Sequence, residues 1–201
     1  MTGIALRIHR KARALAAALL WLALATPGAI AQEEPAVASR APWKTVVLGE
    51  RKGPNQYRAA LDAAAIKLGD SANEILGRPA FPYAREPREV ALVVLTGRRL
   101  GMQQPEPLAQ LYRRARLAGL ALCPAEVGPQ LRLAYRDQPR GQVLHVAMEP
   151  VATWSGAPTI LALANFGTPL LIGSNGSESF MVPPRFVFAL PDPQGLQARG
   201  R

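Results

Sequence analysis

The sequence has few of the residues that form disulfides, bind metal ions or act in catalysis. Its 201 residues include one cysteine and two histidines, and aromatic residues make up 6%. A lone cysteine, Cys123, cannot form an intramolecular disulfide, so the fold must depend on packing. One cysteine and one histidine beyond the N-terminal region are too few soft ligands for zinc, and we expect no metal and no other cofactor. The nucleophile elbow, the P-loop and the dinucleotide fingerprint are also missing from the sequence.

The N-terminal region has the three-part pattern of a secretory signal peptide. Basic residues between positions 7 and 13 precede a wholly apolar stretch at 14–25, and Pro27-Gly28 then interrupts any helix. The small residues of Ala29-Ile30-Ala31 predict a signal peptide over 1–31, followed by a flexible lead-in over 32–42. The alternative is an uncleaved anchor, but the stretch is shorter than the roughly 20 apolar residues that cross a bilayer.

The positive charge is mild once the leader is removed. Residues 1–31 hold four of the 24 basic residues and none of the 14 acidic residues, so cleavage lowers the net charge from +10 to +6. The remaining arginines are spread out, without the long basic run or the stacking aromatics that single-strand binders use. We therefore expect a solvated basic surface and no nucleic-acid partner. The mature protein should be periplasmic or extracellular and should contain no transmembrane segment.

Hydrophobic periodicity predicts a β-α-α-β-α order for the first half of the domain. The strand at 89–96 is nearly continuously apolar, as expected of a strand that is covered on both faces. An apolar stripe with helical spacing predicts a helix over 56–68. The predicted elements are strands at 43–48 and 89–96 and helices at 56–68, 70–76 and 108–118.

The second half is rich in turn signals and predicts an antiparallel β-meander. Residues 131–135 alternate, meet a turn at 137–141 and should pair with the next strand as a hairpin. Strands are predicted at 131–135, 143–151, 159–166, 170–172 and 185–190. Together these elements predict a single α+β domain over 43–190 and a disordered tail over 191–201.

Residues 120–139 read LALCPAEVGPQLRLAYRDQP, residues 147–150 read AMEP, and residues 185–188 read RFVF. This combination resembles a family of small, uncharacterised bacterial proteins that carry an LCPAEVGPxLRLxYxDQP-like motif. The resemblance covers roughly Trp43 to Leu190. It implies a shared fold and carries no known activity, so it assigns no catalytic residue.

The segment 123–132 provides the candidate binding residues. Its two prolines and its glycine should stiffen a loop between the third helix and the meander, and polar side chains would then form a ligand-binding rim. The alternative is a structural connection in which Glu126 binds backbone donors and pairs with an arginine. The candidate ligand-binding residues are Glu126, Gln130, Arg132, Tyr135 and Asp137.

Two weaker arrangements could support catalysis. Cys123 and His145 could form a thiolate–imidazole pair, although the apolar surroundings of Cys123 in the sequence favour a small buried side chain. Glu149 with Glu126 or Asp137 could form the carboxylate pair of a glycoside hydrolase, but nothing in the spacing requires it.

The preferred hypothesis is a non-enzymatic exported module that binds a protein or a cell-envelope component through the surface around 126–137. Its main alternative is a small hydrolase that acts on envelope material, with Glu126 or Glu149 as general acid/base. A secreted toxin or effector is the third hypothesis.

Overall fold

A computed structural model describes residues 41–181 and 185–191 of the chain. These residues belong to one compact unit. The predicted signal peptide, nearly all of the predicted lead-in and the predicted tail beyond residue 191 lie outside the described residues. No helix within the described part is both long enough and apolar enough to cross a membrane.

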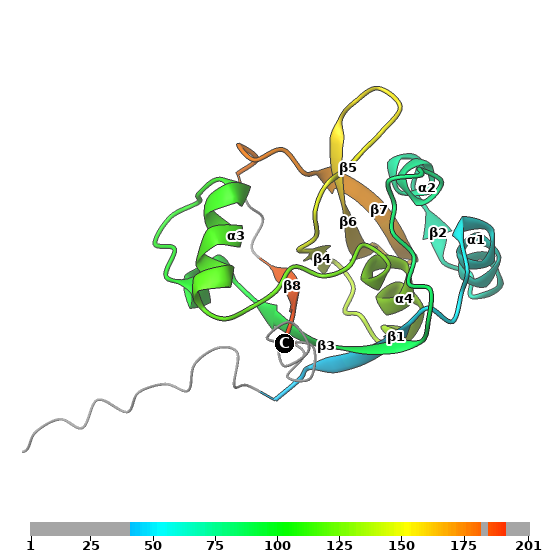
Figure 1. Cartoon of the computed structure of the whole chain (residues 1–201), viewed down its shortest axis with the longest axis horizontal. Helices are drawn as coiled ribbons and strands as arrows, with labels where there is room; N and C mark the ends of the chain where they lie inside the picture. Colours follow the sequence, from blue (N-terminus) through cyan, green and yellow to red (C-terminus); the bar gives the residue numbers. More distant parts are fainter. Residues whose placement is uncertain (1–40, 182–184, 192–201) are drawn as a thin grey trace, which may run out of the picture. The chain divides into compact units, whose positions relative to one another are not determined.

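The described residues form a mixed α+β fold, which agrees with the predicted fold class (Figure 1). The helices are α1 (Pro54–Ala63), α2 (Asp70–Leu76), the 3-10 helix η2 (Gly97–Leu100), α3 (Leu108–Leu117) and α4 (Val127–Ala134). The strands are β1 (Lys44–Leu48), β2 (Lys67–Leu68), β3 (Arg88–Leu95), β4 (Val143–Val146), β5 (Val151–Ala152), β6 (Pro158–Asn165), β7 (Pro169–Asn175) and β8 (Phe186–Ala189).

The strands form one sheet in the order β1-β3-β8-β4-β6-β7-β2, and β5 pairs with β6 outside this path. Most pairs are antiparallel, but β4 with β8 and β2 with β7 are parallel. The predicted antiparallel meander is therefore wrong as a description of the whole second half. The last strand, β8, is buried along its entire length and lies between β3 and β4, so it joins the two halves of the chain.

Helix α4 packs against strands near both ends of the strand order. It contacts β1 as well as β6 and β7, and the sheet curls around it (Figure 1). Residues on several sides of α4 are buried, which include Val127, Leu131 and Arg132. The polar segment that was predicted to form an exposed rim is therefore close to the centre of the fold.

Three predicted elements differ from the structure. The strand predicted over 143–151 is divided into β4 and β5, with no strand at 147–150. Residues 131–134, predicted as part of a strand, belong to α4, because Val127, Leu131 and Tyr135 also have the four-residue spacing of a helix face. Pro129 is tolerated in α4 because it lies in the first turn, where the amide has no intrahelical partner. The helix predicted over 56–68 ends at Ala63, and a residue with positive φ, Ala65, turns the chain into β2.

Candidate functional site

Glu126 lies at the N-terminus of α4 and has no exposed surface. Its Oε1 accepts hydrogen bonds from the backbone amide of Gly49 at 3.0 Å and from the hydroxyl of Tyr57 at 2.8 Å. Its Oε2 accepts a hydrogen bond from the amide of Ala84 at 2.7 Å. The carboxylate therefore joins α4 to the loop after β1, to α1 and to the segment before β3. No arginine forms an ion pair with it among residues 41–181 and 185–191.

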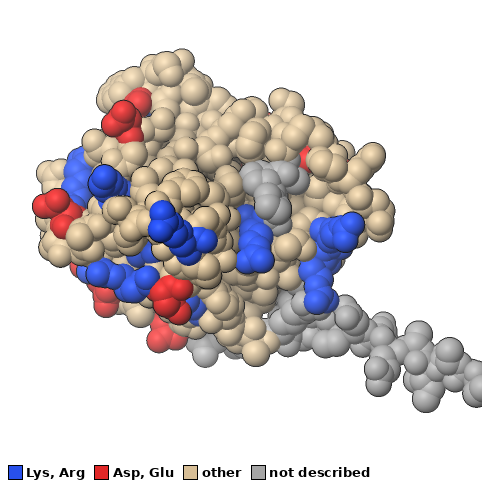
Figure 2. All heavy atoms as spheres, turned by 180° about the vertical axis from the view of Figure 1, so that it is seen from behind, with Lys and Arg blue, Asp and Glu red and all other residues tan. Residues whose placement is uncertain are grey.

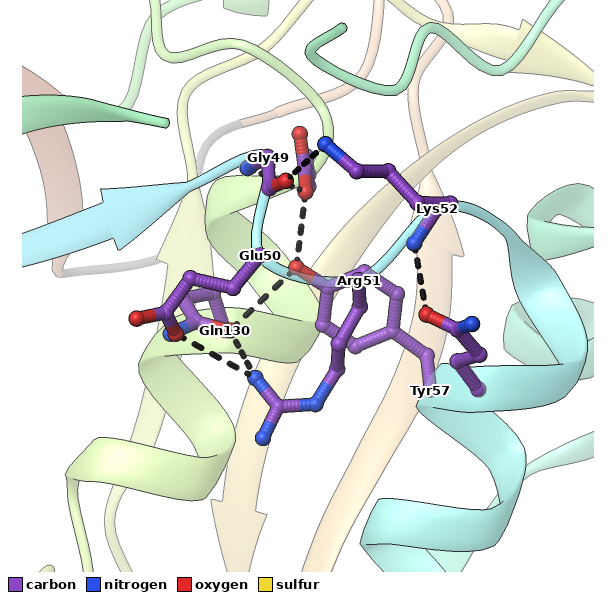
Figure 3. A network of polar contacts seen from close by, with 8 residues as sticks. Gly49, Glu50, Arg51, Lys52, Tyr57 and Gln130 are labelled. Carbon is purple, nitrogen blue, oxygen red and sulfur yellow. Dashed lines mark hydrogen bonds and ion pairs between the residues drawn. The ribbon is translucent and has the colours of Figure 1, made fainter. Parts of the chain in front are cut away.

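Gln130 extends this cluster toward the surface, as Figure 3 shows. Its Oε1 accepts a hydrogen bond from Arg51 Nη1 at 2.9 Å and faces the Tyr57 hydroxyl at 3.2 Å. Burial, with the hydrogen bond to Glu126, raises the pKa of Tyr57 well above its ordinary value, so the phenol stays protonated. Lys52 Nζ donates to the carbonyl of Gly49 at 2.6 Å and closes the loop from the other side. The cluster is a structural framework rather than an open rim.

Arg132 is also fully buried, and backbone and amide oxygens surround its guanidinium. It donates to the side chain of Gln138, to the carbonyl of Tyr135 and, at 3.4 Å, to the carbonyl of Ala164. Burial lowers the pKa of Arg132, and the nearby charge of Arg136 adds to the effect. A side chain with no exposed surface cannot contact a ligand in this conformation, so the predicted rim is wrong for Arg132 and for Glu126.

Of the remaining predicted binding residues, Tyr135 and Asp137 both lie beside Lys44, whereas Gln130 belongs to the Glu126 cluster. Tyr135 is buried, and its hydroxyl donates to Gln142 Oε1 at 3.0 Å. Asp137 is 81% exposed and lies 3.9 Å from Lys44 Nζ. Of the five predicted residues, Gln130 and Asp137 are not buried and Tyr135 is 8% exposed, and for these three the binding role stays a prediction.

Cys123 and His145 do not form a catalytic pair. The thiol is buried and donates to the carbonyl of Val187 at 3.6 Å, and burial raises its pKa. The imidazole Nε2 lies 3.2 Å from Ser174 Oγ, and burial lowers the pKa of His145 to about 4. The thiol and the imidazole thus have different partners, and neither is in the ionisation state that a thiolate–imidazolium pair requires.

The predicted carboxylate pair is not formed either. Glu126 has no exposed surface, whereas the side chain of Glu149 is 78% exposed and lies 3.1 Å from Arg116 Nη2. Asp137 is bound to Lys44 near the start of β1. Within the described ranges, no group of three or more His, Cys, Asp and Glu residues could hold a metal ion.

The structure reveals a groove that sequence reasoning missed. Its first part, here called the α3 cavity, has a volume of about 480 Å³. Its second part, the β7 cavity, has a volume of about 460 Å³. Pro158 and Ser177 line both cavities, so the two parts form one α3–β7 groove. Its polar and charged lining residues include Ser71, Arg116, Glu149, Ser174, Asn175 and Glu178.

Backbone hydrogen bonds hold the walls of the α3 cavity in place. The amide of Leu108 donates to the carbonyl of Phe180 at 2.8 Å, and the amide of Ala109 donates to the carbonyl of Glu178 at 3.1 Å. On the same helix, the hydroxyl of Tyr112 donates to the carbonyl of Met148 at 3.1 Å. The cavity thus combines three segments that are far apart in the sequence. Glu149 was the only lining residue that the sequence singled out.

The basic side chains do not form one continuous patch on the face that Figure 2 shows. Lys and Arg lie there singly or in small groups, with uncharged surface between them and acidic residues among them. This distribution agrees with a solvated basic surface.

In comparisons with family models, with curated proteins and with solved structures, nothing matches this chain. Its similarity to an uncharacterised bacterial family therefore stays a prediction. The α3–β7 groove is the feature on which a function can be based.

Proposed function

We propose that this chain is an exported binding module that holds a cell-envelope component in the α3–β7 groove. The observation that carries the proposal is the groove itself, formed by two adjoining cavities of about 480 and 460 Å³. Cavities of roughly 300–1,000 Å³ with an apolar wall and a few polar groups are typical of ligand sites. Here Pro150 and Pro158 provide accessible apolar wall, and the hydroxyl and amide groups of β7 provide the polar one.

Export is supported by the leader pattern and by cysteine usage. The basic, apolar and small-residue segments of 1–31 are typical of a cleaved signal peptide. A single buried cysteine needs no disulfide partner, so the fold is compatible with an oxidising compartment. We propose the periplasm or the extracellular space as the place where the groove meets its ligand.

The alternative of an envelope-acting hydrolase needs a different acid pair from the one that the sequence suggested. Glu126 has no exposed surface, so only Glu149 of the predicted pair could reach a substrate. Glu178 is the second carboxylate that lines the α3 cavity with Glu149. A hydrolase would therefore use Glu149 and Glu178, and both carboxylates would have to flank one glycosidic bond.

The test uses protein that is expressed as the full chain and purified from the exported fraction. Envelope extract is passed over the immobilised protein, and bound material is identified by mass spectrometry. Ser177→Trp fills the junction of the two cavities, whereas Thr168→Trp fills a separate cavity of about 570 Å³ beside the start of β7 and serves as the matched control. We expect the wild type and Thr168→Trp to retain the same component and Ser177→Trp to lose it.

Two outcomes would contradict the proposal. Equal retention by Ser177→Trp would mean that the groove is not the binding site. Release of cleaved glycan by the wild type but not by Glu149→Gln would replace the binding module with the hydrolase.

A further inference from the structure

The α3 cavity has a negative net charge although the chain as a whole is basic. Its charged lining residues are Arg116, Glu149 and Glu178, and the formal net charge of the chain is +10. Arg116 and Glu149 neutralise each other in an ion pair of 3.1 Å. The carboxylate of Glu178 has no ion pair and no side-chain hydrogen bond among residues 41–181 and 185–191. One uncompensated negative charge therefore remains at the cavity.

The start of α3 does not offset this charge. The first amides of a helix commonly bind an anion, because they carry partial positive charge and lack intrahelical partners. Here the amides of Leu108 and Ala109 are already bound to the carbonyls of Phe180 and Glu178. These two amides are therefore not free to bind a phosphate or a carboxylate.

The wall beside Glu178 is apolar and partly aromatic. Leu108 and Tyr112 line it from α3 but are almost fully buried, so Pro150 and Pro158 provide most of its accessible apolar surface. The hydroxyl of Tyr112 is already bound to the carbonyl of Met148, and burial raises the pKa of this phenol, so the residue offers no further donor and only the small part of its ring that is not buried. An aliphatic chain packs well on such a wall, and an ammonium group near an aromatic ring gains cation–π attraction.

From these features we propose that the α3 cavity binds an aliphatic primary amine, with the ammonium group at the Glu178 carboxylate and the apolar stem along Pro150 and Pro158. This inference rests on the proposed function and specifies the ligand chemistry of the same groove. Two kinds of ligand carry such an aliphatic ammonium group: a free diamine and a lysine-type side chain of an envelope peptide. A flexible stem allows either source to reach the carboxylate from the open side of the cavity.

The test measures binding of two amine probes to the purified exported protein by isothermal titration calorimetry. The probes are 1,5-diaminopentane and Nα-acetyl-lysine amide, and their neutral counterpart is Nα,Nε-diacetyl-lysine amide. We expect at least one amine to bind, the neutral probe to bind at least about tenfold more weakly, and salt to weaken amine binding. Binding of both amines would assign the site to the shared ammonium group, and preference for the lysine derivative would assign it to a peptide.

Glu178→Gln removes the charge and keeps the shape of the side chain. It should weaken amine binding about three- to tenfold. Glu89→Gln changes another exposed glutamate, on β3 and outside the cavity, and should leave binding unchanged. Thermal unfolding of both variants checks that each is folded.

Failure of this inference can be separated from failure of the proposed function. If Ser177→Trp abolishes retention of the envelope component while the amines fail to bind, or bind no better than the neutral probe, the groove remains the binding site and the amine proposal is wrong. If Ser177→Trp leaves both envelope retention and amine binding unchanged, both proposals are wrong.

Discussion

At the scale of single residues, Glu126 and Glu149 show how burial determines the role of the same side chain. Glu126 has no exposed surface, and its two oxygens accept three hydrogen bonds. Glu149 is 78% exposed and has one exposed partner. A buried carboxylate with all its donors in place stabilises the segments that it joins, whereas an exposed ion pair contributes little.

Glu126→Gln should lower the free energy of unfolding by about 1–3 kcal/mol. The amide of glutamine has only one acceptor oxygen, so its NH₂ group would face either the amide of Ala84 or the amide of Gly49. Urea unfolding at pH 7 measures the change. Glu149→Gln is the control and should change the free energy by less than about 0.5 kcal/mol. Equal effects of the two substitutions would contradict the structural role of Glu126.

His145 should make the stability depend on pH in a defined window. Burial lowers the pKa of the folded imidazole from 6.5 to about 4. The unfolded chain therefore binds a proton first as the pH falls, and stability decreases from pH 6.5 toward pH 4. Between pH 7 and pH 5 the loss from this group should be about 2 kcal/mol.

His145→Gln removes the titrating group, so the difference in unfolding free energy between pH 7 and pH 5 should shrink in the variant. Both proteins contain the same carboxylates, so their contribution to the pH dependence cancels when this difference is compared between the two proteins. An unchanged pH dependence would show that the folded imidazole is not protected from protonation.

At the scale of elements, α4 depends on close contact with β6. A Cβ atom added at Gly128 would lie 2.4 Å from Leu161 Cδ1 and 3.0 Å from Leu161 Cβ, so only glycine allows the helix to approach the strand this closely. The helix contacts β1 on its other side, so it has little freedom to move away.

Gly128→Ala should lower the free energy of unfolding by about 1–3 kcal/mol through overpacking. Leu161→Ala removes the side chain that the new methyl group would meet. In that background Gly128→Ala should lower the free energy of unfolding much less, and a double-mutant cycle measures this coupling. Gly53→Ala is the control, because a Cβ there meets nothing within 4 Å. Additive effects of Gly128→Ala and Leu161→Ala would mean that the two residues do not pack together.

The sequence predicted those elements whose apolar pattern is local. The strands β1 and β3 and the helices α2 and α3 lie within about two residues of their predicted positions, because each shows its own period or clear end signals. Helix α4 was missed because it is buried on several sides and contains Gly128, Pro129 and an alternating stretch that also suits a strand. Its identity as a helix depends on the strands that surround it.

The candidate site was less predictable than the fold. Glu149 stood out in the sequence, but Arg116 and Glu178 had no local signal that they share a cavity with it. Their proximity arises from the backbone hydrogen bonds between the start of α3 and residues 178–180. Such contacts between distant segments cannot be read from composition or periodicity.

At the scale of the whole molecule, β8 holds the two halves of the chain together. It pairs with β3 from the first half and with β4 from the second. The segment that contains Cys123 is attached at the same place, because the amide of Cys123 donates to the carbonyl of Ala147 at 2.6 Å and its thiol faces the carbonyl of Val187. Exposure of the thiol therefore requires the central strands to separate from this segment.

Cys123 should accordingly report global unfolding. We expect it to react very slowly with a disulfide reagent such as DTNB under native conditions, because the thiol is buried and burial raises its pKa. The reaction rate should rise with urea along the global unfolding curve, since the open state that reacts is the unfolded state. Glu126→Gln should accelerate the native-state reaction about tenfold for each 1.4 kcal/mol of lost stability, whereas Glu149→Gln should not. A fast reaction that is independent of urea and equal in both variants would mean that the segment around Cys123 opens on its own while the sheet stays intact.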